Sequence, residues 1–160
     1  MITRRTLIAA LPLGFAACTL PDVSPSARTT VIMIRHADRA GEVLNSKGIA
    51  RAAAMPAALA RYDLDAIYAP DIQRNLDTAA PLATATGLPV TVIVKEQAGA
   101  RMTADYPDGT VIWVGNKGNL RTIWAELGAP GQPPQEYGEI GVIELQGTGR
   151  HRVTRLTVGP

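Results

Sequence analysis

A short hydrophobic run ends in an arginine and a histidine whose side chains could carry out phosphoryl chemistry. Residues 31–34 read Val-Ile-Met-Ile, which is typical of a strand buried on both faces of a parallel sheet, and Arg35 and His36 follow directly. In open α/β sheets, ligands bind at this end of the strands. Arginine carries a permanent forked charge that fits phosphate, and imidazole can act as a nucleophile or base near neutral pH. The pair indicates a phosphate site, although an ordinary polar strand end has the same short sequence.

Two more polar clusters follow strands that the sequence predicts at residues 66–69 and 111–114. Arg74 falls in the first turn of the helix after the first of these strands. There its guanidinium can share an anion with free backbone N–H groups and with the positive end of the helix dipole. Residues 115–119 form a glycine-flanked polar turn that leads into another helix. Separately, the arginine could be a helix-surface charge and the turn an ordinary loop. If the strands are neighbours, all three polar ends form one small-anion site.

Strands and helices alternate along the chain and predict an α/β fold. A helix capped by Asn45 or Ser46 should be kinked or split by Pro56, and a second helix should be capped by Asp71 and end before Gly87. The full set of expected elements is strands 30–34, 66–69, 90–94 (buried) and 111–114, helices 46–61, 71–86 and 119–127, and a hairpin of 141–145 with 153–158 that turns at 147–149. The expected architecture is a three-layer sandwich. Its mainly parallel central sheet has helices on both faces and a C-terminal antiparallel hairpin at one edge.

The first 18 residues read as an export signal of the lipoprotein type. Arg4 and Arg5 precede an apolar run, 7–17, that is too short to span a membrane. Residues 15–18 (Phe-Ala-Ala-Cys) resemble a bacterial lipobox, whose cysteine is acylated, and residues 3–7 resemble a twin-arginine signal. The alternative is a signal cut nearby, with an incidental cysteine. We expect a signal at 1–18 with acylated Cys18, a tether at 19–28, and a domain at 29–160 in the cell envelope that faces the periplasm or the exterior.

Composition limits the expected partners of the domain. The chain has 160 residues, enough for one domain, and only 4% aromatic residues, so no stacking platform for single-stranded nucleic acid is evident. Removal of residues 1–18 takes Arg4 and Arg5 from 16 basic residues and leaves all 14 acidic ones, so the domain is nearly neutral. Cys18 is the only cysteine, which excludes an intrachain disulfide. We expect a small phosphorylated substrate or phosphate and a membrane held through the lipid anchor, but no nucleic acid; the oligomeric state is not indicated.

Two segments together resemble the histidine phosphatase superfamily, which includes phosphoglycerate mutases and phosphohistidine phosphatases. Arg35-His36 is followed by Leu-Asn-Ser-Lys-Gly at 44–48 and by Tyr-Ala-Pro-Asp-Ile-Gln-Arg-Asn-Leu-Asp-Thr-Ala at 68–79. The family pattern is an Arg-His pair after the first strand and a later Arg-Ala-x-x-Thr-Ala. Residues 74–79 keep the arginine and the Thr-Ala at this spacing. The resemblance extends over nearly all of residues 30–160 and implies the same fold.

The resemblance also implies catalytic roles that need neither metal nor cofactor. His36 would attack phosphorus as a neutral imidazole and become a phosphohistidine. Arg35 and Arg74 would hold the non-bridging oxygens and offset their charge in the transition state. The other histidine, His151, falls in the terminal hairpin, where a solvated strand residue is expected.

The chain departs from the family pattern where a second histidine is expected. The family segment Val-x-His-Gly-Gly-x-Ile-Arg aligns without a gap with residues 114–121, and Asn116 stands at the histidine position. Asparagine can donate a hydrogen bond to phosphate but carries no charge, and the loss of one transition-state donor costs about 10²–10³ in rate. Lys117 either restores the charge or points to solvent. The expected phosphate-binding residues are Arg35, Arg74, Asn45, Asn116 and Lys117.

The general acid is expected after the third strand, where the family usually has a Glu or an Asp. Glu96 is the best candidate, and the alternatives are Asp38, Asp105 and Asp108, although the position of each is more typical of a surface carboxylate. Two functions follow from different classes. One is an envelope phosphatase acting through His36. The other is a pseudo-phosphatase that binds a phosphorylated ligand or a protein partner without turnover, which Asn116 favours.

Overall fold

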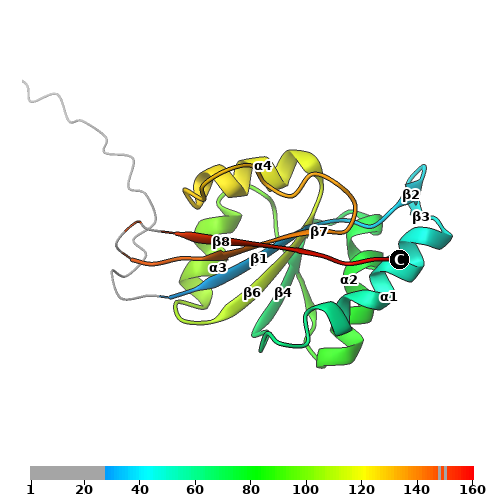
Figure 1. The fold of residues 1–160 in the computed structure, drawn as a ribbon, viewed down its shortest axis with the longest axis horizontal. Helices are drawn as coiled ribbons and strands as arrows, with labels where there is room; N and C mark the ends of the chain where they lie inside the picture. The colour runs from blue at the N-terminus through cyan, green and yellow to red at the C-terminus, as the bar shows by residue number, and fades with distance from the viewer. Residues whose placement is uncertain (1–27, 148, 150) are drawn as a thin grey trace, which may run out of the picture.

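The computed structural model describes residues 28–147, 149 and 151–160. The predicted export signal, Cys18 and the tether up to residue 27 lie outside the described residues, as does Thr148 in the predicted hairpin turn. No helix in the described part is long and apolar enough to cross a membrane. The described elements form an α/β fold with a central six-stranded sheet and four helices (Figure 1).

The sheet has the strand order β5-β4-β6-β1-β7-β8. The first four strands in this order are parallel to one another, whereas β7 pairs antiparallel with β1 and β8 pairs antiparallel with β7. The sequence prediction of a mainly parallel sheet with a C-terminal antiparallel hairpin is thus confirmed. The strand bounds are β1 Thr30–Arg35, β4 Ala66–Ala69, β5 Val90–Val92, β6 Thr110–Gly115, β7 Glu139–Glu144 and β8 Arg152–Thr157.

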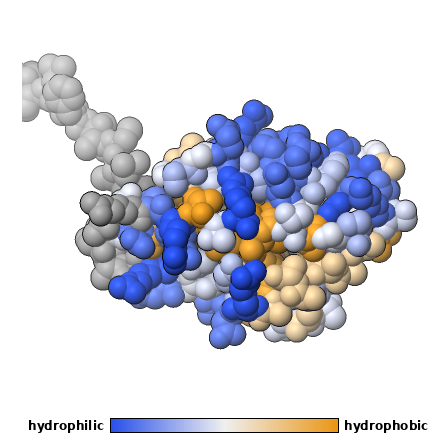
Figure 2. Space-filling model, viewed as in Figure 1, coloured by the Kyte–Doolittle hydropathy of each residue, from blue (hydrophilic) through white to orange (hydrophobic). Residues whose placement is uncertain are grey.

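The helices cover both faces of the sheet, as predicted. Alternate residues of β1 point to opposite faces: Ile32 packs in the cluster beneath α1 (Ser46–Ala58) and α2 (Gln73–Thr86), and Met33 packs in the cluster beneath α3 (Ala98–Asp105) and α4 (Lys117–Glu126). Figure 1 shows α1 and α2 on one side of the sheet and α3 and α4 on the other. On the face that presents β8, the surface is mostly hydrophilic, with a hydrophobic band across its middle (Figure 2).

Several element predictions are corrected by the structure. The third strand is shorter than predicted and is not buried: β5 is an edge strand, in which Val92 is 49% exposed, because no strand pairs with it on its outer side. The N-cap of α2 is Ile72 rather than Asp71, with no side-chain cap bond. Helix α1 runs through Pro56 unsplit and ends at Ala58, only two residues beyond the proline.

Two strands and one helix were not predicted, and another helix begins earlier than expected. The short hairpin of β2 (Arg39–Ala40) and β3 (Val43–Leu44) and the helix α3 lack a clear periodic pattern in the sequence. Helix α4 begins at Lys117, two residues before the predicted start, because Asn116 caps it. The helix stop is close to the prediction, since Gly128 follows the C-cap with a positive φ of 63°.

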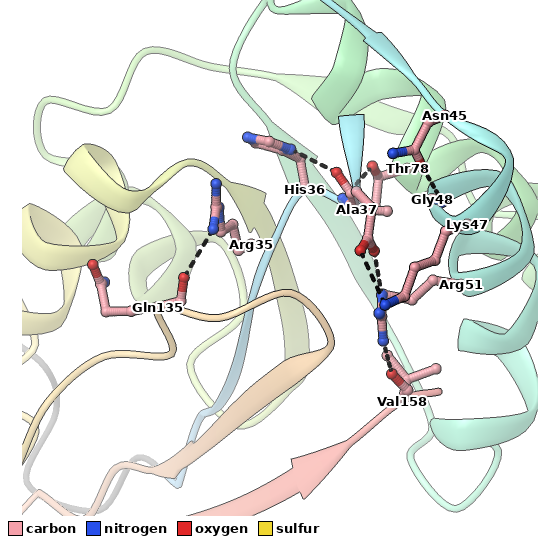
Figure 3. Close-up of polar contacts among 11 residues, drawn as sticks. Arg35, His36, Ala37, Asn45, Lys47, Gly48, Arg51, Thr78, Gln135 and Val158 are labelled. Atoms are coloured by element: carbon pink, nitrogen blue, oxygen red, sulfur yellow. Dashed lines mark hydrogen bonds and ion pairs between the residues drawn. The ribbon is translucent and has the colours of Figure 1, made fainter. Parts of the chain in front are cut away.

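A buried ion pair ties the strand end of β1 to α1 and to the end of the chain. Arg51 is 6% exposed and Asp38 is 8% exposed, and the Arg51 Nε donates to Asp38 Oδ2 at 2.6 Å. The Arg51 Nη1 also donates to the carbonyl oxygen of Val158 (Figure 3). Burial acts to raise the pKa of Asp38, but the hydrogen bond and charge of Arg51 outweigh it and hold the pKa below its usual 3.8.

We expect Arg51→Met to lower the free energy of unfolding by about 3–5 kcal/mol, because it leaves the Asp38 carboxylate buried and unpaired. Urea unfolding at pH 7 measures the loss. The double variant Arg51→Met with Asp38→Asn should recover much of it. In the wild type, the stabilisation from Asp38 is present above pH 4 and is lost as the pH falls through its lowered folded-state pKa. An equally stable Arg51→Met variant would contradict the assignment.

Candidate active site

The polar ends of three neighbouring strands converge, as the sequence predicts. Strand β6 lies between β4 and β1, and Arg35 is in register with Gly115. The His36 backbone N–H donates to the Gly115 carbonyl at 2.7 Å, and the Asn75 side-chain Nδ2 donates to the Val114 carbonyl at 3.0 Å. The second bond brings the first turn of α2 against the end of β6. These contacts place Arg35, His36 and the start of α2 around one end of the sheet.

His36 is buried at the end of β1, and one of its ring nitrogens is hydrogen-bonded to the backbone. The residue is only 2% exposed, and its Nδ1 lies 2.9 Å from the Ala37 carbonyl oxygen. A carbonyl oxygen only accepts, so Nδ1 carries the proton and Nε2 keeps its lone pair. Burial is the main cause of a lowered pKa for His36, since the opposing hydrogen bond to Ala37 is outweighed; the positive charges that add to this lowering are those of Arg35, Arg74 and Arg39.

The lowered pKa predicts how activity depends on pH. Because the pKa of His36 lies below its usual 6.5, the imidazole is neutral at pH 7 and loses its lone pair only as the pH falls below 6.5. For a nucleophilic His36, we expect the acid limb of kcat/KM, corrected for ionisation of the substrate, to fall below pH 6.5. The imidazole titration of His36 followed by NMR should have the same midpoint. A midpoint above 6.5 would contradict this picture of the site.

Two arginines present hydrogen-bond donors that no described residue uses. Arg35 Nη1 donates to the Gln135 carbonyl at 3.1 Å, and Arg74 Nη1 pairs with the carboxylate of Glu42 at the tip of the β2–β3 hairpin. Within the described part of the chain, the Nε atoms of both arginines are buried without a partner. The third such atom, Asn75 Oδ1, is an acceptor and would not bind an anion. Figure 3 shows Arg35 on the same side of the strand end as the His36 ring, with Arg51 on the other side.

Thr78 fixes the backbone that follows His36. Its Oγ1 accepts from the Ala37 N–H at 3.0 Å and donates to the Arg74 carbonyl at 2.7 Å, and the residue is 1% exposed. One hydroxyl therefore joins the turn that bears the histidine to the turn of α2 that bears the second arginine. Thr78 is the threonine of the Thr-Ala in the sequence motif, but its role in positioning the backbone was not predicted.

The predicted amide ligands both serve as helix caps. Asn45 Oδ1 accepts from Gly48 N at 2.9 Å at the start of α1. Asn116 Oδ1 accepts from the N–H groups of Gly118 and Asn119 at 3.0 and 3.1 Å, and Asn119 returns a bond to the Asn116 N–H. The oxygen of each amide is therefore engaged with the backbone, and only the NH₂ group is left to donate to an anion.

The predicted charged residues are placed less closely around His36. Lys117 is exposed and pairs with Glu136 at 3.4 Å. Glu96 is exposed on the segment between β5 and α3, and its described ion pair is with Lys95 at 3.7 Å. No described contact joins Glu96 to either arginine or to His36. In contrast, Glu42, which the sequence did not single out, lies against Arg74.

The alternative acids have other partners. The lowered pKa of Asp38 keeps it ionised beside Arg51, which argues against donation of a proton by this residue. Asp105 accepts from the Tyr68 hydroxyl at 3.1 Å and from Arg101 Nε at 2.8 Å, and Asp108 accepts from the Arg28 N–H. The described residues contain no cluster of three or more His, Cys, Asp or Glu side chains that could hold a metal ion.

Tyr137 is a site residue that sequence reasoning missed. Its ring centroid lies 3.8 Å from Arg35 Cζ and 5.8 Å from the His36 ring, with an interplanar angle of 58°. The residue is in the loop before β7, far from every recognised motif, and a single aromatic in a loop has no pattern that would reveal this contact.

The family comparison agrees with this geometry. Residues 27–96 match the model of the histidine phosphatase superfamily, branch 1. The matched stretch contains Arg35, His36 and Arg74 and ends before β6, so Asn116 lies beyond it. No curated protein has a significant sequence match to the chain.

Several solved structures share the fold. The protein histidine phosphatase SixA, in complex with tungstate, has a TM-score of 0.66 at 16% identity, and the alignment covers 80% of this chain and 96% of SixA. YhfR of Bacillus stearothermophilus has a TM-score of 0.65 at 18% identity, and the alignment covers 79% of this chain and 95% of YhfR. A mycobacterial glucosyl-3-phosphoglycerate phosphatase, in complex with inorganic phosphate, has a TM-score of 0.60 at 17% identity. This alignment covers 84% of this chain and 98% of the mycobacterial protein. At these identities the likeness establishes the fold alone.

Proposed function

We propose that the chain is a histidine phosphatase that hydrolyses phosphomonoesters, without a metal ion, through a phosphohistidine on His36. The observation that carries the proposal is a neutral histidine beside two arginines whose buried Nε–H groups have no partner among the described residues. Two guanidinium groups and a nucleophilic nitrogen are what transfer of a phosphoryl group requires. The match of residues 27–96 to the superfamily supports the same assignment.

In the proposed reaction the phosphoryl group is transferred twice. His36 Nε2 donates its lone pair to phosphorus while the bond from phosphorus to the leaving oxygen breaks, and Nδ1 remains bonded to the Ala37 carbonyl. The leaving oxygen takes a proton. Water then attacks the phosphohistidine and gives a proton to the carboxylate that protonated the leaving oxygen. The P–N bond breaks, and the electron pair returns to Nε2 as phosphate is released. Arg35 and Arg74 neutralise the equatorial oxygens in both steps, and the phosphate competes with Glu42 for Arg74.

For the proton donor we propose Glu96, as the sequence predicts, with Glu42 as the competing carboxylate because it contacts Arg74. The two are separated by Glu96→Gln and Glu42→Gln variants assayed on aryl and alkyl phosphates. Loss of the true acid slows the alkyl phosphate far more, because its leaving oxygen is the more basic.

We further propose that the phosphatase acts in the cell envelope on an exposed phosphomonoester, anchored through acylated Cys18. The support is the sequence of residues 1–18 and the tether at 19–28. Incorporation of labelled fatty acid into the wild type, but not into Cys18→Ala, tests the anchor. Labelling of neither would rule it out.

A second candidate function is a pseudo-phosphatase that binds phosphate without turnover. It is favoured by Asn116, whose side-chain oxygen is engaged in capping α4 and which carries no charge to stabilise the transition state. Binding of inorganic phosphate without release of phosphate from any ester would support it.

The decisive experiment for the proposed phosphatase is to trap the covalent intermediate. The full chain is mixed with radiolabelled aryl phosphate in EDTA and quenched in alkali or in acid after short times. A phosphohistidine survives alkali and is lost in acid, and its appearance should precede steady release of phosphate. Steady release without an alkali-stable phosphoenzyme would exclude the histidine mechanism, and turnover abolished by EDTA would exclude metal independence.

A further inference from the structure

The segment Gln135–Tyr137 contacts three of the site residues. The Gln135 carbonyl accepts from Arg35 Nη1 at 3.1 Å, Glu136 pairs with Lys117, and the Tyr137 ring lies against Arg35 and near His36. The segment belongs to the loop before β7 and lies outside the stretch that matches the family. It therefore forms a wall of the site that no recognised motif supplies.

The wall is held in a defined position. The Glu139 carboxylate accepts from the N–H groups of Gln135 and Glu136 at 2.9 and 3.0 Å, and these bonds to Glu136 and Gln135 hold the pKa of Glu139 below its usual range. Gly138 has a φ of 84°, and a Cβ there would lie 2.4 Å from the Val158 carbonyl oxygen. The Gly138 carbonyl in turn accepts from Val158 N at 2.9 Å. A loop with these bonds presents Tyr137 in one place.

We propose that Tyr137 is a positioning residue, which holds the plane of the Arg35 guanidinium so that its remaining N–H groups point to the bound phosphoryl group. The inference rests on the proposed function, because it needs Arg35 to be an oxyanion ligand. A guanidinium stacked on an aromatic face keeps all its donors available at its edges. One edge of Arg35 is already bonded to Gln135, and its Nε is buried without a described partner. The ring and the carbonyl together leave the guanidinium one orientation.

The test compares variants of the full chain that keep or remove the aromatic face. Titration calorimetry measures the affinity for inorganic phosphate, and steady-state kinetics with an aryl phosphate give kcat/KM. Tyr137→Phe should stay within about twofold of the wild type in both measurements, whereas Tyr137→Leu should weaken both by about five- to thirtyfold, the range that a cation–π contact supports. Tyr137→Met is the second variant if Tyr137→Leu melts early. Tyr62→Leu is the matched control, because it removes a second Arg–Tyr contact, with Arg61, on the segment after α1.

An Arg35→Lys background distinguishes the orienting role of Tyr137 from a merely structural one. In that background Tyr137→Leu should cause no further loss, because the planar group that the ring orients is gone. Equal losses in both backgrounds would overturn the inference, as would wild-type affinity in Tyr137→Leu. A loss in Tyr137→Phe as large as in Tyr137→Leu would assign the effect to the hydroxyl and also overturn it. If the wild type neither binds phosphate nor releases it, the proposed function fails and the inference with it.

Discussion

Phosphate release by His36→Ala is expected to fall by about 10⁴-fold or more, to the background rate, because the variant has no atom that can accept the phosphoryl group. The remaining site should still bind phosphate, since Arg35 and Arg74 are unchanged. Initial rates on an aryl phosphate and calorimetric binding of phosphate give the two quantities. Full loss of turnover with retained binding is the pattern that a covalent role of His36 requires.

The matched control for this variant is His151→Ala. His151 is the only other histidine of the chain, and its Nδ1 contacts the Gln146 N–H in the terminal hairpin. Its replacement should leave kcat/KM within about twofold. Turnover that survives in His36→Ala would mean that another nucleophile or a directly attacking water does the chemistry, and the proposed mechanism would be wrong.

Asn116→His is expected to raise kcat/KM by about 10²-fold, since it supplies a charged donor where the wild type has a neutral amide. The gain has a structural cost. Asn116 Oδ1 caps α4 by accepting from Gly118 and Asn119, and histidine does not reproduce this bond, so the free energy of unfolding should fall by about 1 kcal/mol. Steady-state kinetics and urea unfolding of the same preparation measure both effects.

Asn116→Asp separates the two roles. An aspartate keeps the cap and is favoured by the helix dipole, but it places a negative charge beside the phosphate. We therefore expect unchanged stability and weaker phosphate binding. An Asn116→His protein that is folded and binds phosphate, but is no faster than the wild type, would show that the missing charge is not what limits turnover.

The His36→Ala and Asn116→His variants also decide between the proposed functions. A wild type that turns over and depends on His36 is a phosphatase that works with asparagine in the second position. A silent wild type that Asn116→His activates is a pseudo-phosphatase, in which the arginines and the nucleophile are retained for binding.

The sequence by itself determined the architecture, and it predicted the residues that we propose as the centre of the site. The β-branched runs at 31–34 and 111–114 specified buried parallel strands, and the glycine at 87 specified a helix end. The Arg35-His36 pair and Arg74 were found because they stand at strand and helix ends, and such positions depend on local sequence signals. The same signals misplaced the start of α4 by two residues and did not show that β5 is an edge strand.

Only the tertiary structure decided which side chains surround that centre. Tyr137 lies 102 positions from Arg35 in the sequence, yet its ring lies 3.8 Å from the guanidinium carbon. Glu42 forms an ion pair with Arg74, and Asp38 forms one with Arg51, which argues against Asp38 as the acid. These contacts depend on how loops pack once β7 lies beside β1. Such packing is set by shape and burial across distant segments, and neither residue type nor spacing carries that information.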